Sequence, residues 1–530
     1  MKISPLFVFF SGIIFFLTCC IHEPVTPNRC YYLSASGSDG NMGTKENPWQ
    51  TIAKVNTIDF NPGDTIFLEG GSLFQGTVKF DSLDSGTEGK NVTIKSFGTG
   101  KAIINGDLSS GIEVNNCDYF NAEDLIITGA GRKDGNIADG VLVTGSSHIL
   151  ADGLEITGFQ HSGLHVFKCN DVRITKVYSH DNGFSGIHIS GNTAGDPEKF
   201  DNEDIYIGYC KTENNPGDPT VLTNHSGNGI LASSVDRGVI EYCESFNNGW
   251  DMPWTGNGPV GIWIWDCNEF RIQYCISHDN KTNPVAKDGG GFDLDGGVSN
   301  SVIQYCLSYN NQGGGYGLFE FGAAKPWENN TLRYCISSND GSLNGGSIAV
   351  WRGSNEMTMR NCDIYNNTFY NSLSSGFSLM IENNAPGFRY FNNIFVFKEA
   401  FLRPGTKLVS ELFQNNCYFN LKGDKSIAGF KNIDEWAAIT SNEMLNGMMV
   451  GIFSDPLLND PAGFSTAGTV NLNPALLASF SLKPGSPLAG KGLDLKKVFT
   501  LDRGATDISG NDLSQDSVFD IGALKYLKKE

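Results

Sequence analysis

RIQYC at residues 271–275 and VIQYC at residues 302–306 are the clearest copies of the motif that decides the fold. Related segments end at Cys210, Cys243, Cys335 and Cys362. The successive Cys-to-Cys intervals are 33, 32, 31, 29 and 27 residues, and an Asn-containing polar run follows each copy. A repeat of this length predicts a solenoid in which each copy forms one coil.

A second short strand, usually led by glycine, lies upstream of each copy. Examples are GIWIW (261–265), GFDLD (291–295) and SIAVW (347–351). Stacked parallel strands lie about 4.8 Å apart, and their side chains alternate between core and surface. We interpret the cysteines as a buried core ladder and the asparagines as a ladder that satisfies backbone groups at the turns. The sequence therefore predicts an all-β, right-handed parallel β-helix with capping segments.

The chain divides into five predicted parts. They are a lipoprotein signal peptide (1–19), a tether (20–30), the β-helix with its groove (31–400), an irregular insertion with a short helix (401–460) and a closing β-helix segment (461–530). Caps are expected at both ends because an uncovered coil exposes open strand edges.

The N-terminus indicates export. Lys2 precedes an apolar stretch from Leu6 to Leu17, which is too short to span a bilayer comfortably. LTCC at residues 17–20 resembles a bacterial lipobox, with Cys20 as the lipidated residue; an ordinary cleaved signal peptide is the alternative. We expect an outer-membrane lipoprotein of the bacterial cell envelope, facing the periplasm or the outside, that contacts the membrane only through this anchor.

The net charge restricts the partners. With 58 acidic and 38 basic residues, the chain carries a formal charge of −20. Such a surface repels nucleic acid, so nucleic acid is not an expected partner. A neutral carbohydrate, or an acidic one held at a local cationic patch, remains compatible with this charge.

Alternation along the Gly-led strands predicts a row of outward side chains. If Phe292, Leu294, Phe319 and Phe321 point inward, the outward row is Trp265, Asp295, Glu320 and Trp351, with Trp263 and Asp293 in the neighbouring row. Exposed indoles favour stacking on sugars, and paired carboxyl groups hydrolyse glycosidic bonds. Outward His165 and His188 lie farther along, as a distal subsite or as solvated surface residues, and Arg352 is placed to bind a carboxylate or sulfate or to form a surface ion pair.

The spacing of the carboxyl groups bears on the mechanism. Asp295 and Glu320 are one coil apart, about 4.8 Å, which suits the roughly 5–5.5 Å of a retaining glycosidase. Asp293 and Glu320 lie on a diagonal of roughly 8 Å, inside the inverting range. Both pairs remain open at this point.

The segment GFDLDGGVSNSVIQYCLSYNNQGGGYGLFEFG, around residues 290–322, resembles the β-helix glycosidases of glycoside hydrolase family 120, the β-xylosidase family. The resemblance implies that Asp295 is the nucleophile and Glu320 the acid/base. It implies a glycoside hydrolase without a cofactor, acting on a polysaccharide or oligosaccharide.

Two other classes fit the same residues. The segment AKDGGGFDLDGG resembles family 9 pectate lyases, which implies calcium held by Asp279, Asp288, Asp293 and Asp295, with Lys287 or Lys325 as the base. A non-catalytic glycan-binding β-helix would need only the tryptophan platform.

Overall fold

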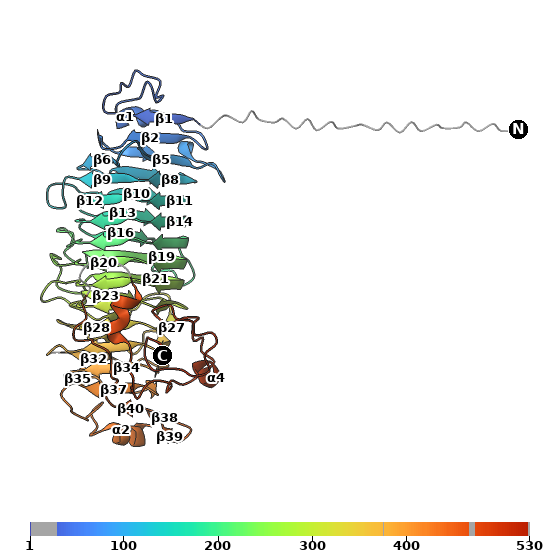
Figure 1. The fold of residues 1–530 in the computed structure, drawn as a ribbon. Helices are drawn as coiled ribbons and strands as arrows, with labels where there is room; N and C mark the ends of the chain where they lie inside the picture. Colours follow the sequence, from blue (N-terminus) through green and yellow to red (C-terminus); the bar gives the residue numbers. More distant parts are fainter. Residues whose placement is uncertain (2–28, 375, 466–471, 528–530) are drawn as a thin grey trace.

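The computed structural model describes residues 1, 29–374, 376–465 and 472–527 and forms the expected stack of coils (Figure 1). Strands of successive coils pair in parallel, and in the described residues they form a 24-stranded and a 14-stranded sheet. This confirms the predicted all-β parallel β-helix. The predicted signal peptide after Met1, Cys20 and most of the tether lie outside the described residues.

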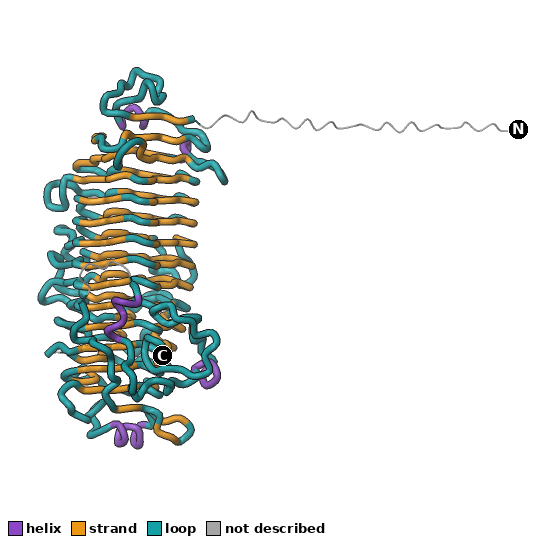
Figure 2. Tube along the Cα trace, viewed as in Figure 1, coloured by secondary structure: helices purple, strands orange, loops and turns teal. Residues whose placement is uncertain are grey.

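The strands fall on three faces of each coil, shown as stacked layers in Figure 2. The face that carries the candidate site contains β4 (Val78–Phe80), β7 (Ile112–Asn115), β10 (Val141–Thr144), β13 (Ser162–Phe167), β16 (Ser185–Ser190), β19 (Asn228–Glu241), β21 (Val260–Gln273), β23 (Gly290–Leu294), β26 (Tyr316–Glu320), β29 (Ile348–Arg352), β32 (Phe377–Glu382) and β35 (Ala400–Leu402). The next face contains β1 (Cys30–Leu33), β2 (Thr65–Glu69), β5 (Val92–Phe97), β8 (Phe120–Glu123), β11 (Ser147–Asp152), β14 (Asn170–Thr175), β17 (Asn202–Gly208), β24 (Val302–Gln304), β27 (Trp327–Arg333), β30 (Met359–Tyr365), β33 (Phe388–Phe391) and β36 (Leu412–Gln414).

The third face is the 14-stranded sheet. It contains β3 (Leu73–Gln75), β6 (Ala102–Asp107), β9 (Leu125–Gly129), β12 (Glu155–Thr157), β15 (Tyr178–His180), β18 (Lys211–Glu213), β20 (Glu244–Phe246), β22 (Ile276–His278), β25 (Leu307–Tyr309), β28 (Ile336–Ser338), β31 (Thr368–Asn371), β34 (Ile394–Phe397), β37 (Cys417–Asn420) and β40 (Ile452–Phe453). The long strands β19 and β21 continue from the first face to the second and join them into one sheet.

Two ladders hold the coils together, as the repeat predicts. The six motif cysteines are buried and free of disulfides. At the turns, Asn248 donates from its side chain to Asn280 Oδ1 (2.9 Å), and Asn280 donates in the same way to Asn311 (3.0 Å). The side-chain oxygens of Asn280 and Asn311 also accept from the backbone N–H groups of Asn248 and Asn280, respectively. The buried polar groups at these turns are therefore satisfied.

The ends of the β-helix differ from the predicted division. At the N-terminal end, α1 (Ile52–Val55) covers the first coil, and η1 (Ser82–Asp84) follows β4. At the other end, β35 to β37 and β40 continue the sheets through part of residues 401–460, so this stretch is not wholly an insertion. The helix α2 (Ile433–Thr440) and the hairpin of β38 (Met444–Leu445) and β39 (Met448–Met449) lie at this end (Figure 1).

The C-terminal segment was expected to close the β-helix, but it packs along its side (Figures 1 and 2). It contains α3 (Pro474–Leu477), η2 (Ala478–Phe480) and α4 (Leu495–Phe499). Asp502 forms an ion pair with Arg333 (2.9 Å), and the Asn366 side chain donates to the Asp520 and Gly522 carbonyls. A large apolar cluster joins the segment to the coils, which explains why it does not need to continue the stack.

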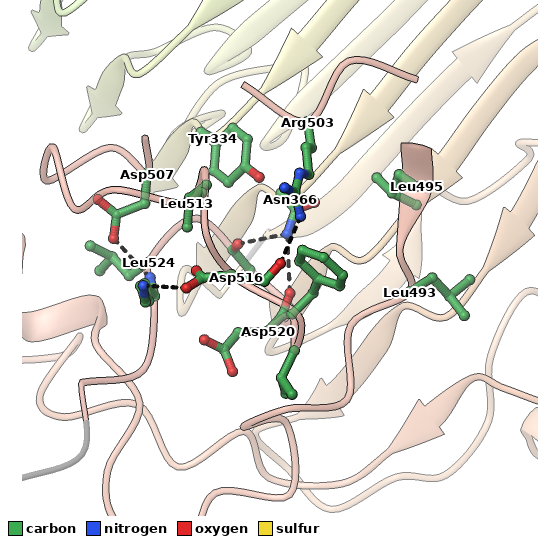
Figure 3. Close-up of a pocket in the computed structure, with 14 residues that line it drawn as sticks. Tyr334, Asn366, Leu493, Leu495, Arg503, Asp507, Leu513, Asp516, Asp520 and Leu524 are labelled. Atoms are coloured by element: carbon green, nitrogen blue, oxygen red, sulfur yellow. Dashed lines mark hydrogen bonds and ion pairs between the residues drawn. The ribbon is translucent and has the colours of Figure 1, made fainter. Parts of the chain in front are cut away.

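A small cavity of about 30 Å³ remains under this segment (Figure 3). Figure 3 shows Tyr334 and Asn366 of the coils beside Asp507, Asp516 and Asp520 of the C-terminal segment. A volume of this size holds about one or two waters and no sugar, so we assign it to side-on packing. In the described part of the chain, no helix is long and apolar enough to cross a membrane.

Candidate active site

The register of β26 corrects the predicted orientation of one coil. Tyr316 pairs with Phe292 and Leu318 pairs with Leu294, and all four side chains are buried in the core. Tyr316 and Leu318 are therefore the inward residues of this strand. Because side chains alternate, the residues at 319 and 321 point outward and the residue at 320 does not.

Phe319 and Phe321, expected in the core, instead line a surface cavity, and Glu320 does not line it. Glu320 is 1% exposed and is the last residue of β26, where backbone N–H groups surround its carboxylate. Gly297 N–H donates to Oε2 (3.1 Å), and the N–H groups of Gly322 and Ala323 donate to Oε1 (2.5 and 2.8 Å). Burial raises its pKa. The prediction that Glu320 faces the groove is therefore wrong, and the Asp295–Glu320 spacing no longer supports a retaining mechanism.

The outward row also changes its members. Asp295 donates its N–H to Ile264 O (2.9 Å), which places it beside Trp265. The next positions are Phe319 and then Trp351, which pair directly, and Trp351 pairs with Glu382. The row along the groove is Trp265, Asp295, Phe319, Trp351 and Glu382. The neighbouring row runs Trp263, Asp293, Gly317, Ala349 and Met380.

These rows line a cavity of about 850 Å³. Its acidic residues are Asp288, Asp293, Asp295 and Glu382, and its aromatic residues include Trp263, Trp265, Phe319, Phe321 and Trp351. Such a volume is within the range of small-ligand sites, and carboxyl groups between aromatic faces are suited to binding a sugar ring.

Asp293 forms the floor of the cavity. Its side chain is 2% exposed, and Oδ1 is a buried oxygen without a hydrogen-bond partner in the described residues. A Cβ on Gly317 would lie 2.8 Å from this oxygen, so the glycine leaves room for the carboxyl group. Burial, with the nearby charges of Asp295 and Asp288, raises the pKa of Asp293 well above its usual range. Asp293 is therefore held as a neutral acid beneath the other two carboxyl groups.

Asp288 and Asp295 are more accessible than Asp293, since both are only partly buried. Asp288 lies just before β23 and accepts from Gly258 N–H (2.9 Å), while Asp295 accepts from Gly296 N–H (2.8 Å). Burial raises the pKa of Asp288 to about 6. Burial, together with the charges of Asp288 and Glu320, raises the pKa of Asp295 to about 7. Between about pH 6 and pH 7, the two groups together therefore carry about one proton.

The three predicted binding tryptophans differ in how far they are exposed. Trp265 and Trp351 are partly exposed and contact Phe321 and Phe319, with ring centroids 6.0 and 6.5 Å apart. Trp263 lines the cavity but is almost fully buried, and its Nε1 donates to Asn228 (3.1 Å). Trp265 and Trp351 therefore form the accessible platform, whereas Trp263 supports the wall.

Three other predicted binding residues lie outside this cavity. The rings of His165 and His188 stack with their centroids 4.5 Å apart, in earlier coils of the row that contains Trp263. His165 contacts Asp139 and Ser190. Burial lowers the pKa of His188, which keeps its ring neutral. Arg352, in register with Glu320, lines a second cavity. The predicted distal subsite is therefore not continuous with the main cavity.

The residues of the alternative calcium site do not fit that ion. Asp279 does not line the cavity; it pairs with His278 Nδ1 (2.7 Å). Across the residues described, no group of three or more His, Cys, Asp or Glu side chains is arranged to hold a metal. Of the two alternative bases, Lys325 is buried in an ion pair with Asp266 (2.7 Å), whereas Lys287 is exposed and lines the cavity. We derive no metal-dependent step from this site.

Sequence reasoning missed Phe319, Phe321 and Glu382, and it considered Asp288 only as a calcium ligand. The available signal was the Gly-led alternation itself, because counting from Gly317 as from Gly291 places Leu318 inward and Phe319 outward. Starting the strand at Gly315, two residues earlier, keeps the same faces and aligns Tyr316 with Phe292. Asp288 comes from the loop before β23, and Glu382 comes from a coil three repeats later, so no local pattern connects them.

The fold and the site define a parallel β-helix that presents carboxyl groups between aromatic rings in a surface cavity. Residues 31–331 match the family model described as "Pel9A-like, right handed beta helix region". The chain belongs to this family, which also confirms the predicted right-handed coil and the likeness to carbohydrate-active β-helix proteins.

Individual relatives are more distant. The chain is 24% identical over 502 residues to the lacto-N-biosidase of Bifidobacterium longum subsp. longum, an alignment covering 74% of this chain and 30% of that protein. The chain thus spans less than a third of this relative's length. A crystal structure of GH136 lacto-N-biosidase from Eubacterium ramulus superposes with a TM-score of 0.51 at 18% identity, covering 74% of this chain and 68% of that one. Pectate lyase Pel9A superposes with a TM-score of 0.42 at 15% identity, covering 95% and 98%.

Proposed function

We propose that this protein is a glycoside hydrolase that cleaves an oligosaccharide or polysaccharide with the carboxyl pair Asp288 and Asp295. The observation that carries the proposal is that both carboxyl groups line one cavity beside the partly exposed indoles of Trp265 and Trp351. Glycoside hydrolysis requires one carboxyl group that donates a proton and one that is ionised, on either side of the scissile bond. Asp288 takes the second carboxyl position that the sequence assigned to Glu320.

Accessibility excludes Asp293, and ion pairing and distance exclude Glu382, from the acids of the cavity. A catalytic group must reach the glycosidic oxygen or the anomeric carbon, and the Asp293 Oδ1 atom is buried beside Gly317 of the next coil. Asp293 is therefore a positioning residue, whose neutral carboxyl group lies under the pair without adding a third charge. The Glu382 carboxylate is paired with Arg403 and lies three coils from Asp295.

The proposal is tested by incubating the protein with neutral and acidic glycans and analysing the products by mass and ultraviolet absorbance. The glycans include oligosaccharides that contain lacto-N-biose, because two relatives are named lacto-N-biosidase. Hydrolysis adds one water to the products and leaves them saturated. Unsaturated products would instead establish a lyase, and binding without any product would leave only a glycan-binding protein; either result would contradict the proposal.

The two raised pKa values predict a bell-shaped pH dependence of kcat/KM. Activity should fall below about pH 6, where the ionised member of the pair becomes protonated, and above about pH 7, where the other member loses its proton. The measurement is a pH series of initial rates at constant ionic strength. A rate that keeps rising up to pH 9 would contradict the assignment, because no protonated carboxyl group would then be required.

The accessible indoles are expected to contribute binding energy. Trp351→Ala removes an aromatic face beside the cavity and should weaken substrate binding about tenfold, equivalent to about 1.4 kcal/mol. Trp436→Phe is a suitable control, since Trp436 is buried in the far cap and does not line the cavity. Isothermal titration with an inactive Asp295→Asn background measures both variants; unchanged affinity in Trp351→Ala would exclude the platform.

The proposal includes the cellular setting predicted by the sequence. We infer that Cys20 is lipidated and that the β-helix is attached to the outer membrane of a bacterial envelope through this residue. This inference rests on the lipobox pattern alone.

A further inference from the structure

A second cavity, of about 910 Å³, lies beside the candidate active site. It is formed at the C-terminal ends of β29 and β32 and by the loop that follows β35. Its charged side chains are Arg352, Glu382, Arg403 and Lys407. Glu382 and Arg403 also line the active-site cavity, so the two cavities adjoin at this pair.

The second cavity is cationic in a strongly acidic protein. Three cations and one carboxylate line it, which gives a local charge of +2, whereas the whole chain carries −20. The Glu382 carboxylate is already paired with Arg403. Lys407 is exposed and forms no ion pair within the described ranges. A cation without a counter-ion beside a ligand cavity is available to bind an anion.

Arg352 provides a second, independent observation. Its side chain is only 5% exposed, yet its Nε has no hydrogen-bond partner in the described residues. Its Nη2 donates to Asn355 Oδ1 (2.7 Å), and its Nη1 makes a long contact with the Met357 carbonyl (3.5 Å). The neighbouring Glu411 carboxylate is occupied by the backbone N–H groups of residues 385, 409 and 410. A buried guanidinium with unused donors is costly unless an anion completes its bonding.

We propose that this second cavity is a subsite for an anionic group, a carboxylate or a sulfate ester, on the glycan that occupies the active-site cavity. Arg352 would bind the anion through its guanidinium and Lys407 as a mobile cation. The Glu382–Arg403 pair marks the passage between the two subsites. This inference rests on the proposed function for the glycan, whereas the anion site itself can be tested without any hydrolysis.

The direct test follows the Nε–H resonance of Arg352 by NMR, assigned by its loss in Arg352→Gln, in the full-length protein. Sodium sulfate and sodium glucuronate are titrated separately at constant ionic strength, with sodium chloride as the reference salt. We expect a saturable shift with at least one of the two anions, and the two titrations distinguish sulfate from carboxylate. Absence of a saturable shift with both would overturn the proposal.

Two lysine variants distinguish anion binding in the second cavity from general electrostatic attraction to the protein surface. Lys407→Gln should weaken anion binding about fivefold or more, whereas Lys483→Gln, an exposed lysine outside both cavities, should leave it unchanged. Lys407 is on the surface, so this variant is expected to fold even if Arg352→Gln does not. Equal affinities in the two lysine variants would overturn the proposal.

The connection to the glycan is tested with matched oligosaccharides. Xylotetraose with and without a glucuronic acid branch, and a galactotetraose with and without a sulfate, are bound to the inactive Asp295→Asn variant. The charged member of at least one pair should bind about tenfold more tightly, and Lys407→Gln should abolish this difference. A saturable anion shift with no glycan binding would contradict the proposed function while leaving an anion site; equal binding of charged and neutral members would contradict the subsite.

Discussion

Replacing Asp295 or Asp288 by asparagine is expected to lower kcat by about 10³-fold, within the 10²–10⁴-fold range of acid–base catalysis. Asparagine keeps the size of the side chain and its bond to Gly296 or Gly258 N–H, but it neither donates the required proton nor carries the required charge. Glu320→Gln is the matched control. The kcat of this variant should stay within about tenfold of the wild-type value. The Glu320 carboxylate accepts hydrogen bonds from backbone N–H groups and does not line the cavity. Initial rates and melting temperatures should be measured for all three variants.

Azide rescue assigns the two roles within this pair. In a retaining enzyme, azide restores turnover of a substrate with an activated leaving group when the acid/base is missing, and the product keeps the anomeric configuration. When the nucleophile is missing, rescue gives the opposite configuration. Loss of activity in Glu320→Gln, with full activity in Asp288→Asn, would contradict the proposed pair and restore the assignment implied by the family 120 resemblance.

Lys325→Met is expected to lower the free energy of unfolding by about 3–5 kcal/mol, the cost of leaving one member of a buried ion pair uncompensated. Lys325 is 4% exposed, and its partner Asp266 is fully buried. The same lysine donates to the Thr193 carbonyl (3.2 Å) and so ties the loop around Ala194, which lines the active-site cavity, to the coil at β21. We therefore also expect a higher KM.

Urea unfolding followed by circular dichroism measures this effect. Lys483→Met is the control, because a surface lysine of this kind should change stability by no more than about 0.5 kcal/mol. The double variant Lys325→Met with Asp266→Asn should recover part of the loss, since it removes the isolated charge. A loss below about 1 kcal/mol in the single variant would show that Asp266 is stabilised without Lys325.

The repeat by itself determined the architecture. Cys275 and Cys306 stand in equivalent places because one coil adds one layer of core, and a buried thiol packs there as a small apolar group. The asparagine ladder follows from the same periodicity, since each turn presents the same unsatisfied backbone groups. For the same reason, alternation placed Asp293, Asp295, Trp265 and Trp351 correctly on the outer face.

The prediction failed at Glu320 because Phe319 and Phe321 were assigned to the core, although alternation from either Gly315 or Gly317 places them outward. A slip of one residue transfers every side chain of a strand to its other face, so the error placed a caged carboxylate in the groove and two groove aromatics in the core. Apolar character did not decide the face of these residues, because aromatic side chains line the groove as well as the core.

Only the tertiary structure decided which acids meet. Asp288 reaches the cavity from a loop whose backbone is not repeated, and Glu382 and Arg403 come from later coils, so their proximity depends on stacking distances and loop paths. The C-terminal segment shows the same limit: its apolar residues predict burial, but its position along the side of the coils depends on the surface that they leave uncovered. The sequence determined the repeating unit because its interactions are local and periodic, whereas the site depends on single contacts between distant residues.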